Sequence, residues 1–309
     1  MGGVVELIRP AGVTLGPDEG LSVRRTLPMR RRSLIGGWCF LDHFGPQSLR
    51  DGPGMSVAPH PHTGLQTASW LFAGEVEHRD SAGHHALVRP GELNLMTAGR
   101  GISHSEMSTS GAEQLHGVQL WIALPDSARF MEPAFEHFAP PVIERDGLRA
   151  RVFLGSLLGA SSPVATHSRL VGAELLLDAG TTVHLDVDSA FEHGVLLDTG
   201  ALALNGTGVP LHHLGYVAPG TSTLTLHAPQ QSRVLLIGGE PLGEQIVMWW
   251  NFIGRSHDEI VRYREQWQQE NLTGSTDPVD HPVFGWPEGE AQAPILAPEL
   301  PPVRLKSRA

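Results

Sequence analysis

Two short pairs of potential metal ligands are the residues of this chain whose types and spacing could do chemistry. They are His60-Pro61-His62 and His104-Ser105-Glu106, and both lie in sequence of β-strand composition. Because side chains two residues apart in a strand point to the same face, each pair can direct two donor groups towards one point. Two such strands facing each other in a small barrel would bring three imidazoles and one carboxylate together. We therefore predict a metal site of His60, His62, His104 and Glu106, which leaves two positions of an octahedral ion for oxygen and a substrate.

The spacing around the first pair supports this interpretation. Gly54, His60-x-His62, Thr67 and Gly74 reproduce the first cupin signature, except that Thr67 stands where that signature usually has glutamate. The missing carboxylate reappears as Glu106, so the number of ligands is preserved. A single His-x-His pair is more often a solvent-facing strand than a ligand set, whereas two pairs framed by turn-permitting glycines favour a metal site.

The relocated carboxylate, with the segments 74–81 and 96–106 around it, closely resembles the pirin family of double cupins. Segments 40–46 and 238–244 also resemble pirin segments, and the resemblance extends over roughly residues 4–265. It implies an all-β fold of two barrel domains. It also places the three histidine ligands of the family on His60, His62 and His104, and its glutamate ligand on Glu106.

The donor set alone does not select one metal. Three imidazoles and a carboxylate favour Fe(II), Mn(II), Ni(II) or Cu(II) over Mg(II), and Zn(II) would bind but remain redox-silent. The resemblance implies Fe(II), because pirins are generally regarded as iron proteins. Carboxylates should orient the imidazole rings, and the unranked candidates are Glu77, Asp80 and Glu92. For His78 we expect a structural role rather than that of an extra ligand.

The resemblance implies two classes of function. Some pirins resemble quercetinases, which open a flavonol ring with O2 and release carbon monoxide and a depside. In that case Glu106 is either the catalytic base for the substrate hydroxyl or a permanent ligand only. Other pirins are non-catalytic, metal- or redox-sensing regulators that bind a transcription factor or a metabolic enzyme. A cupin isomerase or sugar-binding module would fit the fold but explains the four ligands less well. An apolar slot for a flavonol is required, yet we expect each nearby apolar residue to belong to the core: Trp70, Phe72, Met96, Leu120 and Trp121.

Composition excludes several partners. The net charge of −11 disfavours direct binding of nucleic acid, and no apolar run approaches the length of a membrane span. The first residues lack the basic and apolar regions of a secretory signal, so we expect a cytoplasmic protein, and we expect a monomer. Cys39, the single cysteine, lies in an apolar run and is predicted to be a buried, inert thiol. The arginines at 24–25 and 30–32 are predicted to form a solvated hairpin turn.

The elements that must position the ligands are mostly strands. The 36 glycines and 24 prolines are scattered among short Val, Leu and Thr runs, which is typical of all-β barrels or sandwiches. We predict strands at 65–72, 93–96, 117–123, 151–154, 174–177, 181–185, 194–197, 224–226 and 234–237. One helix is predicted to begin at Ser256, where Ser-His-Asp-Glu259 has the spacing of a capping box and Ile260, Tyr263 and Trp267 recur on one face.

A proline-marked connector divides the chain. We predict a metal-binding cupin domain at 1–140, a second cupin domain at 141–270 and a proline-rich tail at 271–309 that lies on the surface. The second domain is predicted to hold no metal. His184-Leu-Asp186 is its counterpart of the first pair, the adjacent His212 and His213 would point to opposite faces, and Glu192-His193 is read as a turn.

Overall fold

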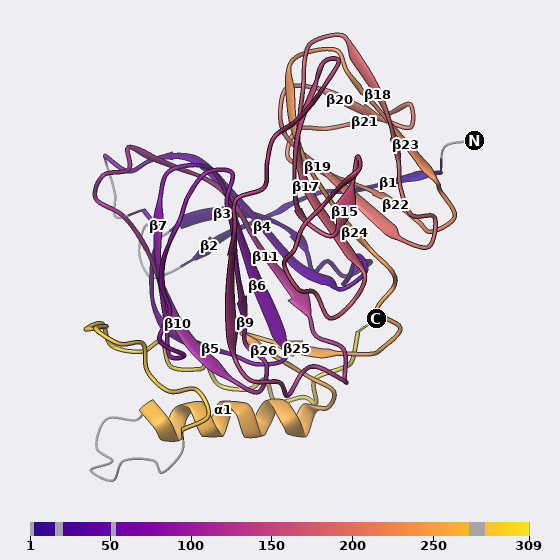
Figure 1. Cartoon of the computed structure of the whole chain (residues 1–309). Coiled ribbons are helices and arrows are strands. Elements are labelled where there is room, and N and C mark those ends of the chain that lie inside the picture. The colour runs from indigo at the N-terminus through magenta and orange to yellow at the C-terminus, as the bar shows by residue number, and fades with distance from the viewer. Residues whose placement is uncertain (1–2, 16–20, 51–53, 272–281, 309) are drawn as a thin grey trace.

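The computed structural model describes residues 3–15, 21–50, 54–271 and 282–308. The described chain forms two β-barrels, coloured mostly purple and mostly pink to orange in Figure 1. Each barrel pairs a seven-stranded sheet with a four-stranded sheet. The predicted all-β, two-barrel fold is confirmed.

The first barrel carries the predicted ligands in its smaller sheet. In spatial order its larger sheet consists of β12 (Ala134–Phe138), β9 (Leu93–Thr97), β6 (Leu65–Ala73), β11 (Gln114–Ala123), β4 (Trp38–Ser48), β3 (Leu21–Leu27) and β2 (Ala11–Leu15). The smaller sheet consists of β5 (Ser56–His62), β10 (Ile102–Ser108), β7 (Val76–Asp80) and β8 (His85–Val88). Neighbouring strands are antiparallel throughout.

The second barrel repeats this plan. Its larger sheet consists of β1 (Val5–Ile8), β22 (Leu214–Val217), β19 (Glu192–Thr199), β24 (Ser232–Gly239), β17 (Leu170–Leu177), β14 (Leu148–Leu154) and β13 (Ile143–Arg145). Its smaller sheet consists of β18 (Thr181–Asp186), β23 (Thr223–Ala228), β20 (Leu202–Leu204) and β21 (Thr207–Val209). Two hairpins form separate two-stranded sheets. They are β15 (Ser156–Leu157) with β16 (Ala160–Ser161) and β25 (Val247–Trp249) with β26 (Phe252–Gly254).

Every strand predicted from the sequence lies within an observed strand, usually one or more residues longer at the ends. One prediction is wrong, since Glu192 and His193 begin β19 and do not form a turn. They point to opposite faces of the strand, as adjacent residues in a strand do. Glu192 accepts hydrogen bonds from Gly36 N–H and from the Tyr216 hydroxyl, whereas the side chain of His193 is fully buried.

Segments from each end of the chain cross to the opposite barrel. The first strand, β1, pairs with β22 in the second barrel. The hairpin β25–β26 packs on the first barrel, where Ile253 N–H donates to Thr63 O (3.0 Å). The domain boundaries at 1–140 and 141–270 stay a prediction. In space, β1 of the first range belongs to the second barrel, and the β25–β26 hairpin of the second range packs on the first barrel.

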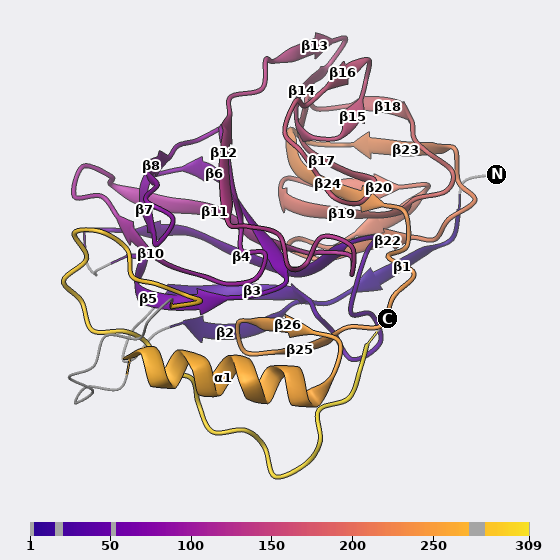
Figure 2. The same cartoon turned by 60° about the horizontal axis from the view of Figure 1, so that its bottom comes forward.

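A single α-helix is present among the described residues, α1 (His257–Asn271), and it lies along one side of the first barrel (Figures 1 and 2). The Ser256 hydroxyl accepts a hydrogen bond from Glu259 N–H (3.2 Å), as the predicted cap requires. The Glu259 carboxylate bonds to Arg255 N–H (2.7 Å), which is one residue earlier than in a capping box. Ile260 and Trp267 are buried, so the predicted apolar face is confirmed. In the described part of the chain, no helix has the length and apolarity needed to span a bilayer.

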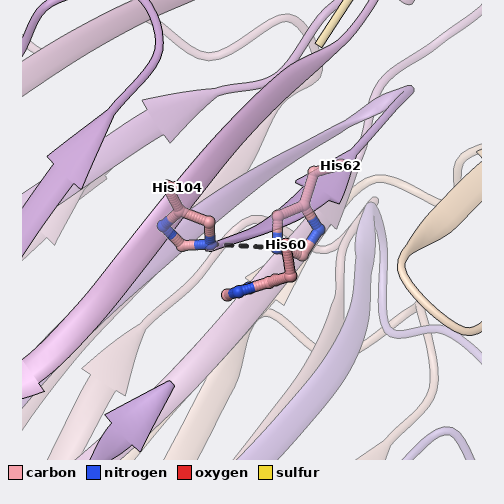
Figure 3. A group of neighbouring side chains, drawn as sticks. All are labelled: His60, His62 and His104. Atoms are coloured by element: carbon pink, nitrogen blue, oxygen red, sulfur yellow. Dashed lines mark hydrogen bonds between the residues drawn. The ribbon is translucent and has the colours of Figure 1, made fainter. Parts of the chain in front are cut away.

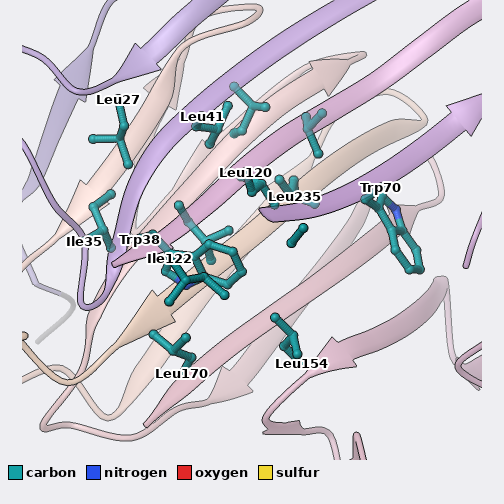
Figure 4. Packing of buried hydrophobic residues seen from close by; sticks show 14 of the residues in the cluster. Leu27, Ile35, Trp38, Leu41, Trp70, Leu120, Ile122, Leu154, Leu170 and Leu235 are labelled. Atoms are coloured by element: carbon teal, nitrogen blue, oxygen red, sulfur yellow. The ribbon is translucent and has the colours of Figure 1, made fainter. Parts of the chain in front are cut away.

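The larger sheets of the two barrels share one hydrophobic core (Figure 4). Trp70 of β6 stacks on Phe153 of β14, with ring centroids 4.6 Å apart. Trp38 of β4 donates its indole N–H to Gly238 O (3.0 Å) in β24. We call this shared core between the two larger sheets the seam. Burial of aromatic rings in the seam joins the two barrels.

Candidate metal centre

The predicted ligands lie on two adjacent strands of the smaller sheet. In the antiparallel pairing of β5 with β10, His60 is opposite His104 and His62 is opposite Ile102. His60, His62, His104 and Glu106 are all buried, with exposed fractions of 7%, 1%, 1% and 6%. The two-residue alternation therefore turns both pairs into the barrel, as the sequence predicts.

The three imidazoles converge on one another (Figure 3). The Nε2 atoms of His62 and His104 are 3.0 Å apart. The ring of His60 lies 4.4 Å from that of His104 and 5.0 Å from that of His62, measured between centroids. One nitrogen from each histidine lies within 4.8 Å of the other two.

These imidazoles are held in the neutral form that donates an electron pair. Burial lowers the pKa of His60 to about 4. Burial, with His60 nearby, also holds the pKa of His62 and of His104 well below the usual range. The Nδ1 atom of His60 lies 2.9 Å from Ala58 O, a contact that places its proton on Nδ1 and leaves Nε2 free.

Glu106 lies beside this group but not among its mutually close atoms. One oxygen of its carboxylate lies instead within 4.8 Å of a nitrogen of His104 and a nitrogen of His78. The pairing of β10 with β5 shifts register between His104 and Glu106, whereas on the other side of β10 Glu106 is directly opposite His78. The bulge therefore moves the carboxylate towards β7.

Two polar side chains of the opposite sheet hold Glu106. The Ser69 hydroxyl of β6 lies 3.3 Å from Glu106 Oε1 and 2.8 Å from Gln119 Oε1. Burial raises the pKa of Glu106 above its usual range, although His78 and hydrogen bonds from Ser69 and Gln119 act in the opposite direction. Neither Ser69 nor Gln119 was predicted from the sequence as a partner of Glu106. A pairing of β6 with β11 that places them opposite each other is the signal that would have found them.

The three carboxylates that were candidates for orienting the imidazole rings have different surroundings in the structure. Asp80 is buried, and its Oδ2 atom lies 3.1 Å from His78 Nε2. Glu77 points to the outer face of β7, where it bonds to Arg79 and His85. Glu92 lies 3.5 Å from His137. His78 is itself buried, and its Nδ1 is 3.4 Å from His104 Nδ1.

The donor set fits a divalent transition metal. Two nitrogens each about 2.1 Å from an ion, at a right angle, are about 3.0 Å apart, which is the observed separation of the His62 and His104 Nε2 atoms. His60 adds a third nitrogen with a free electron pair, and Glu106 supplies a nearby anionic oxygen. Neutral imidazoles with one carboxylate suit borderline first-row ions.

Of the five apolar residues assigned to the core, Trp121 contacts His62, one of the predicted ligands. Its ring meets the edge of the His62 ring at 5.1 Å and stacks on Phe40 at 4.1 Å. Trp70 and Phe72 face the seam between the barrels, where Phe72 lies near His43 and His116. Trp121 therefore forms an apolar wall beside one ligand.

A second group of buried donors lies at the seam, away from the first barrel's interior. His43 and His116 both contact Asp198 Oδ1, at 2.8 and 2.7 Å, while Arg233 contacts Oδ2 at 3.2 Å. Arg24 Nε donates to His43 Nδ1 (3.3 Å). Every contact to Asp198 is thus with a donor group, and the adjacent guanidinium groups disfavour a cation. In the second barrel, His184 and Asp186 are exposed on β18.

Comparisons with known proteins agree with this architecture. The pirin family model matches residues 20–122, and the model of the pirin C-terminal cupin domain matches residues 172–273. A Pseudomonas aeruginosa protein named "Putative quercetin 2,3-dioxygenase" is 42% identical over 270 residues, which cover 87% of this chain and 86% of the relative. A pirin-like protein of Caulobacter vibrioides is 36% identical over 85% of this chain and 92% of its own length.

A solved structure is similar over almost the whole chain. The crystal structure of a quercetin 2,3-dioxygenase from Acinetobacter baumannii has a TM-score of 0.89 and 38% identity, and the match covers 97% of each chain. The resemblance found in the sequence is confirmed: this chain belongs to the pirin family.

Proposed function

We propose that this chain is a metal-dependent dioxygenase that cleaves a flavonol or a related phenolic with O2, using Fe(II) held by His60, His62, His104 and Glu106. The observation that carries the proposal is the convergence of three buried, neutral imidazoles beside a buried carboxylate. The names of the relatives from Pseudomonas and Acinetobacter support the reaction class.

The residues of the chain have separate tasks in this proposal. Bound Fe(II) would supply the one-electron chemistry that lets O2 react with an organic molecule. The three histidines hold the ion, and their enclosure in the barrel excludes water. Glu106, steadied by Ser69 and Gln119, accepts the proton of the substrate 3-hydroxyl.

The first test is aerobic turnover by protein purified and loaded with Fe(II) under anaerobic conditions. We expect flavonol absorbance to fall with uptake of one O2 and release of one carbon monoxide per ring opened. His62→Ala should abolish both metal binding and decay, whereas His184→Ala, an exposed histidine of the second barrel, should change neither. Metal analysis before loading distinguishes Fe(II) from Mn, Ni, Cu and Zn. Absence of decay across several flavonols in metal-replete protein would contradict the enzyme proposal and favour a regulatory role.

The second test concerns Glu106 alone. Glu106→Gln keeps the size of the side chain but removes its ability to accept a proton, so turnover should fall by about 100-fold or more. Metal content, measured on the same sample, should remain. Full turnover with metal retained would exclude the base role, and loss of metal together with turnover would assign Glu106 as a ligand only.

A further inference from the structure

The chain that follows α1 lies against the outer face of the strands that carry the ligands. Residues 282–297 cross from the helix to the region of β5 and β10, in yellow in Figure 2. The Ile295 N–H donates to Pro59 O (2.8 Å), next to His60, and the Ser103 N–H donates to Phe284 O (3.1 Å), next to His104. The Ser103 hydroxyl adds a bond to Gly285 O (2.8 Å). Both ligand strands are therefore tied to one segment from behind.

Glu270 fastens the near end of this segment to the helix. Its carboxylate accepts three consecutive backbone N–H groups, from Val283 (2.8 Å), Phe284 (3.1 Å) and Gly285 (3.3 Å). An acid in the last turn of a helix faces the negative end of the helix dipole, which is unfavourable unless donors compensate it. The three N–H groups provide charge-assisted compensation, so Glu270 suits this contact rather than the helix itself.

Aromatic packing and a second bond hold the rest of the segment. Phe284 is 1% exposed and meets the edge of the Trp267 ring at 5.5 Å. The Trp267 indole N–H donates to Ile295 O (2.9 Å), so the residue that binds Pro59 is also bound to α1. The segment is thus fixed to the helix near both of its contacts with the ligand strands.

We propose that residues 282–297, anchored by Glu270, form a strap that fixes the separation of β5 and β10 and thereby positions His60, His62 and His104 for the metal. Ser103 is the positioning residue at which the strap meets the ligand strand. This proposal rests on the metal site of the proposed function. The strap lies beyond residue 273, where the family models end, so the matched domains do not contain it.

The strap and the metal must then influence each other reciprocally. If the docked strap strengthens metal binding by a given factor, bound metal strengthens strap docking by the same factor. Partners that orient metal ligands from outside the coordination sphere typically change affinity by about 10- to 100-fold. We therefore expect a coupling of about tenfold.

Co(II) titration of the full-length protein tests the proposal, because Co(II) absorption reports both affinity and coordination geometry. Glu270→Gln and Ser103→Ala should each weaken Co(II) binding about tenfold and alter its visible spectrum. Glu265→Gln, which changes an exposed acid on the same helix, should leave both unchanged. If Glu270→Gln and Ser103→Ala both kept the wild-type Co(II) affinity and spectrum, the proposal that the strap positions the histidines would be overturned.

Hydrogen exchange of the wild-type protein tests the same coupling without any substitution. Co(II) should slow exchange of the Phe284, Gly285 and Ile295 amides about tenfold, and no slowing would overturn the proposal even if the variants fail to fold. Absence of Co(II) binding by the wild type would overturn both the metal site and the strap. Tenfold coupling in a protein that does not cleave flavonols would keep the strap and reject the proposed activity.

Discussion

At the scale of single residues, Cys39 shows how burial alone decides reactivity. Its thiol is fully buried on β4 and lies 3.5 Å from Trp121 O. Burial raises the pKa of the Cys39 thiol to about 12. The thiolate is the nucleophile, so almost none of the reactive form exists near neutral pH.

We predict that Cys39 reacts with iodoacetamide at pH 8 at least about a thousandfold more slowly in the folded protein than in urea-unfolded protein. Mass spectrometry of the alkylated fraction over time measures both rates in the same chain. Comparable rates in the two states would show that the thiol is accessible in the fold.

The convergence of His60, His62 and His104 was predictable because strand alternation is local, whereas the placement of Glu106 was not. The bulge between His104 and Glu106 depends on how β10 pairs with β5, which the spacing of two residues does not reveal. The arginines at 24–25 and 30–32 show the same limit. Arg30 and Arg31 are exposed as predicted, but Arg25 pairs with Asp42 at 2.7 Å and Arg32 with Glu6 at 3.0 Å. Their partners lie on other strands.

At the scale of elements, α1 was predictable in its start, its cap and its buried face, because all three depend on residues close in sequence. What it packs against was only partly predictable. Trp249 and Trp250 pack with Leu300 and Leu305 of the tail in one cluster around α1. The described part of the tail lies on the surface, and its Phe284 and Ala297 are buried in that cluster around α1.

We predict that Ser256→Ala lowers the free energy of unfolding by about 1 kcal/mol, because the first turn of α1 loses its side-chain acceptor. Ser110→Ala, at an exposed turn after β10, is the matched control and should change stability by less than about 0.5 kcal/mol. Urea denaturation followed by tryptophan fluorescence measures both. Equal stability of the two variants would mean that the cap contributes nothing in the folded protein.

At the scale of the whole molecule, the way the barrels join could not be predicted, because contacts between residues far apart in sequence leave no local pattern. Asp198 of the second barrel accepts from His43 and His116 of the first, while Arg233 bonds its other oxygen. Burial alone would raise the pKa of Asp198. The hydrogen bonds from His116 and His43 outweigh this effect and hold that pKa below its usual range. The carboxylate is therefore one of the charges that join the two barrels, as is Glu192.

We predict that Asp198→Asn costs about 3–5 kcal/mol of unfolding free energy, since it leaves the buried donors of His43 and His116 without an anionic partner. Arg233 loses one of its two carboxylate contacts and keeps Glu174. Asp186→Asn, at an exposed position on β18, should cost less than about 0.5 kcal/mol. Urea denaturation at pH 7 measures the difference. A cost below about 1 kcal/mol for Asp198→Asn would show that the hydrophobic seam suffices.

One buried histidine in the second barrel should add to the acid sensitivity that the buried histidines of the first barrel give the fold. His193 is 0% exposed and neither of its ring nitrogens has a hydrogen-bond partner among the described residues. Burial lowers the pKa of His193 to about 4, although the nearby Asp188 acts in the opposite direction. The unfolded chain, in which this ring titrates near pH 6.5, therefore binds more protons than the folded chain between pH 6.5 and 4. Stability rises with pH in that window.

As the pH falls from 7 to 4, His193 alone should remove about 3 kcal/mol of stability. In His193→Leu, measured by urea denaturation of metal-free protein at each pH, this part of the loss should disappear, while the part due to His60, His62 and His104 remains. His184→Leu, at an exposed position, should retain the full loss seen in the wild type. Parallel pH profiles of wild type and His193→Leu would mean that the ring is protonated, and so solvated, in the folded barrel.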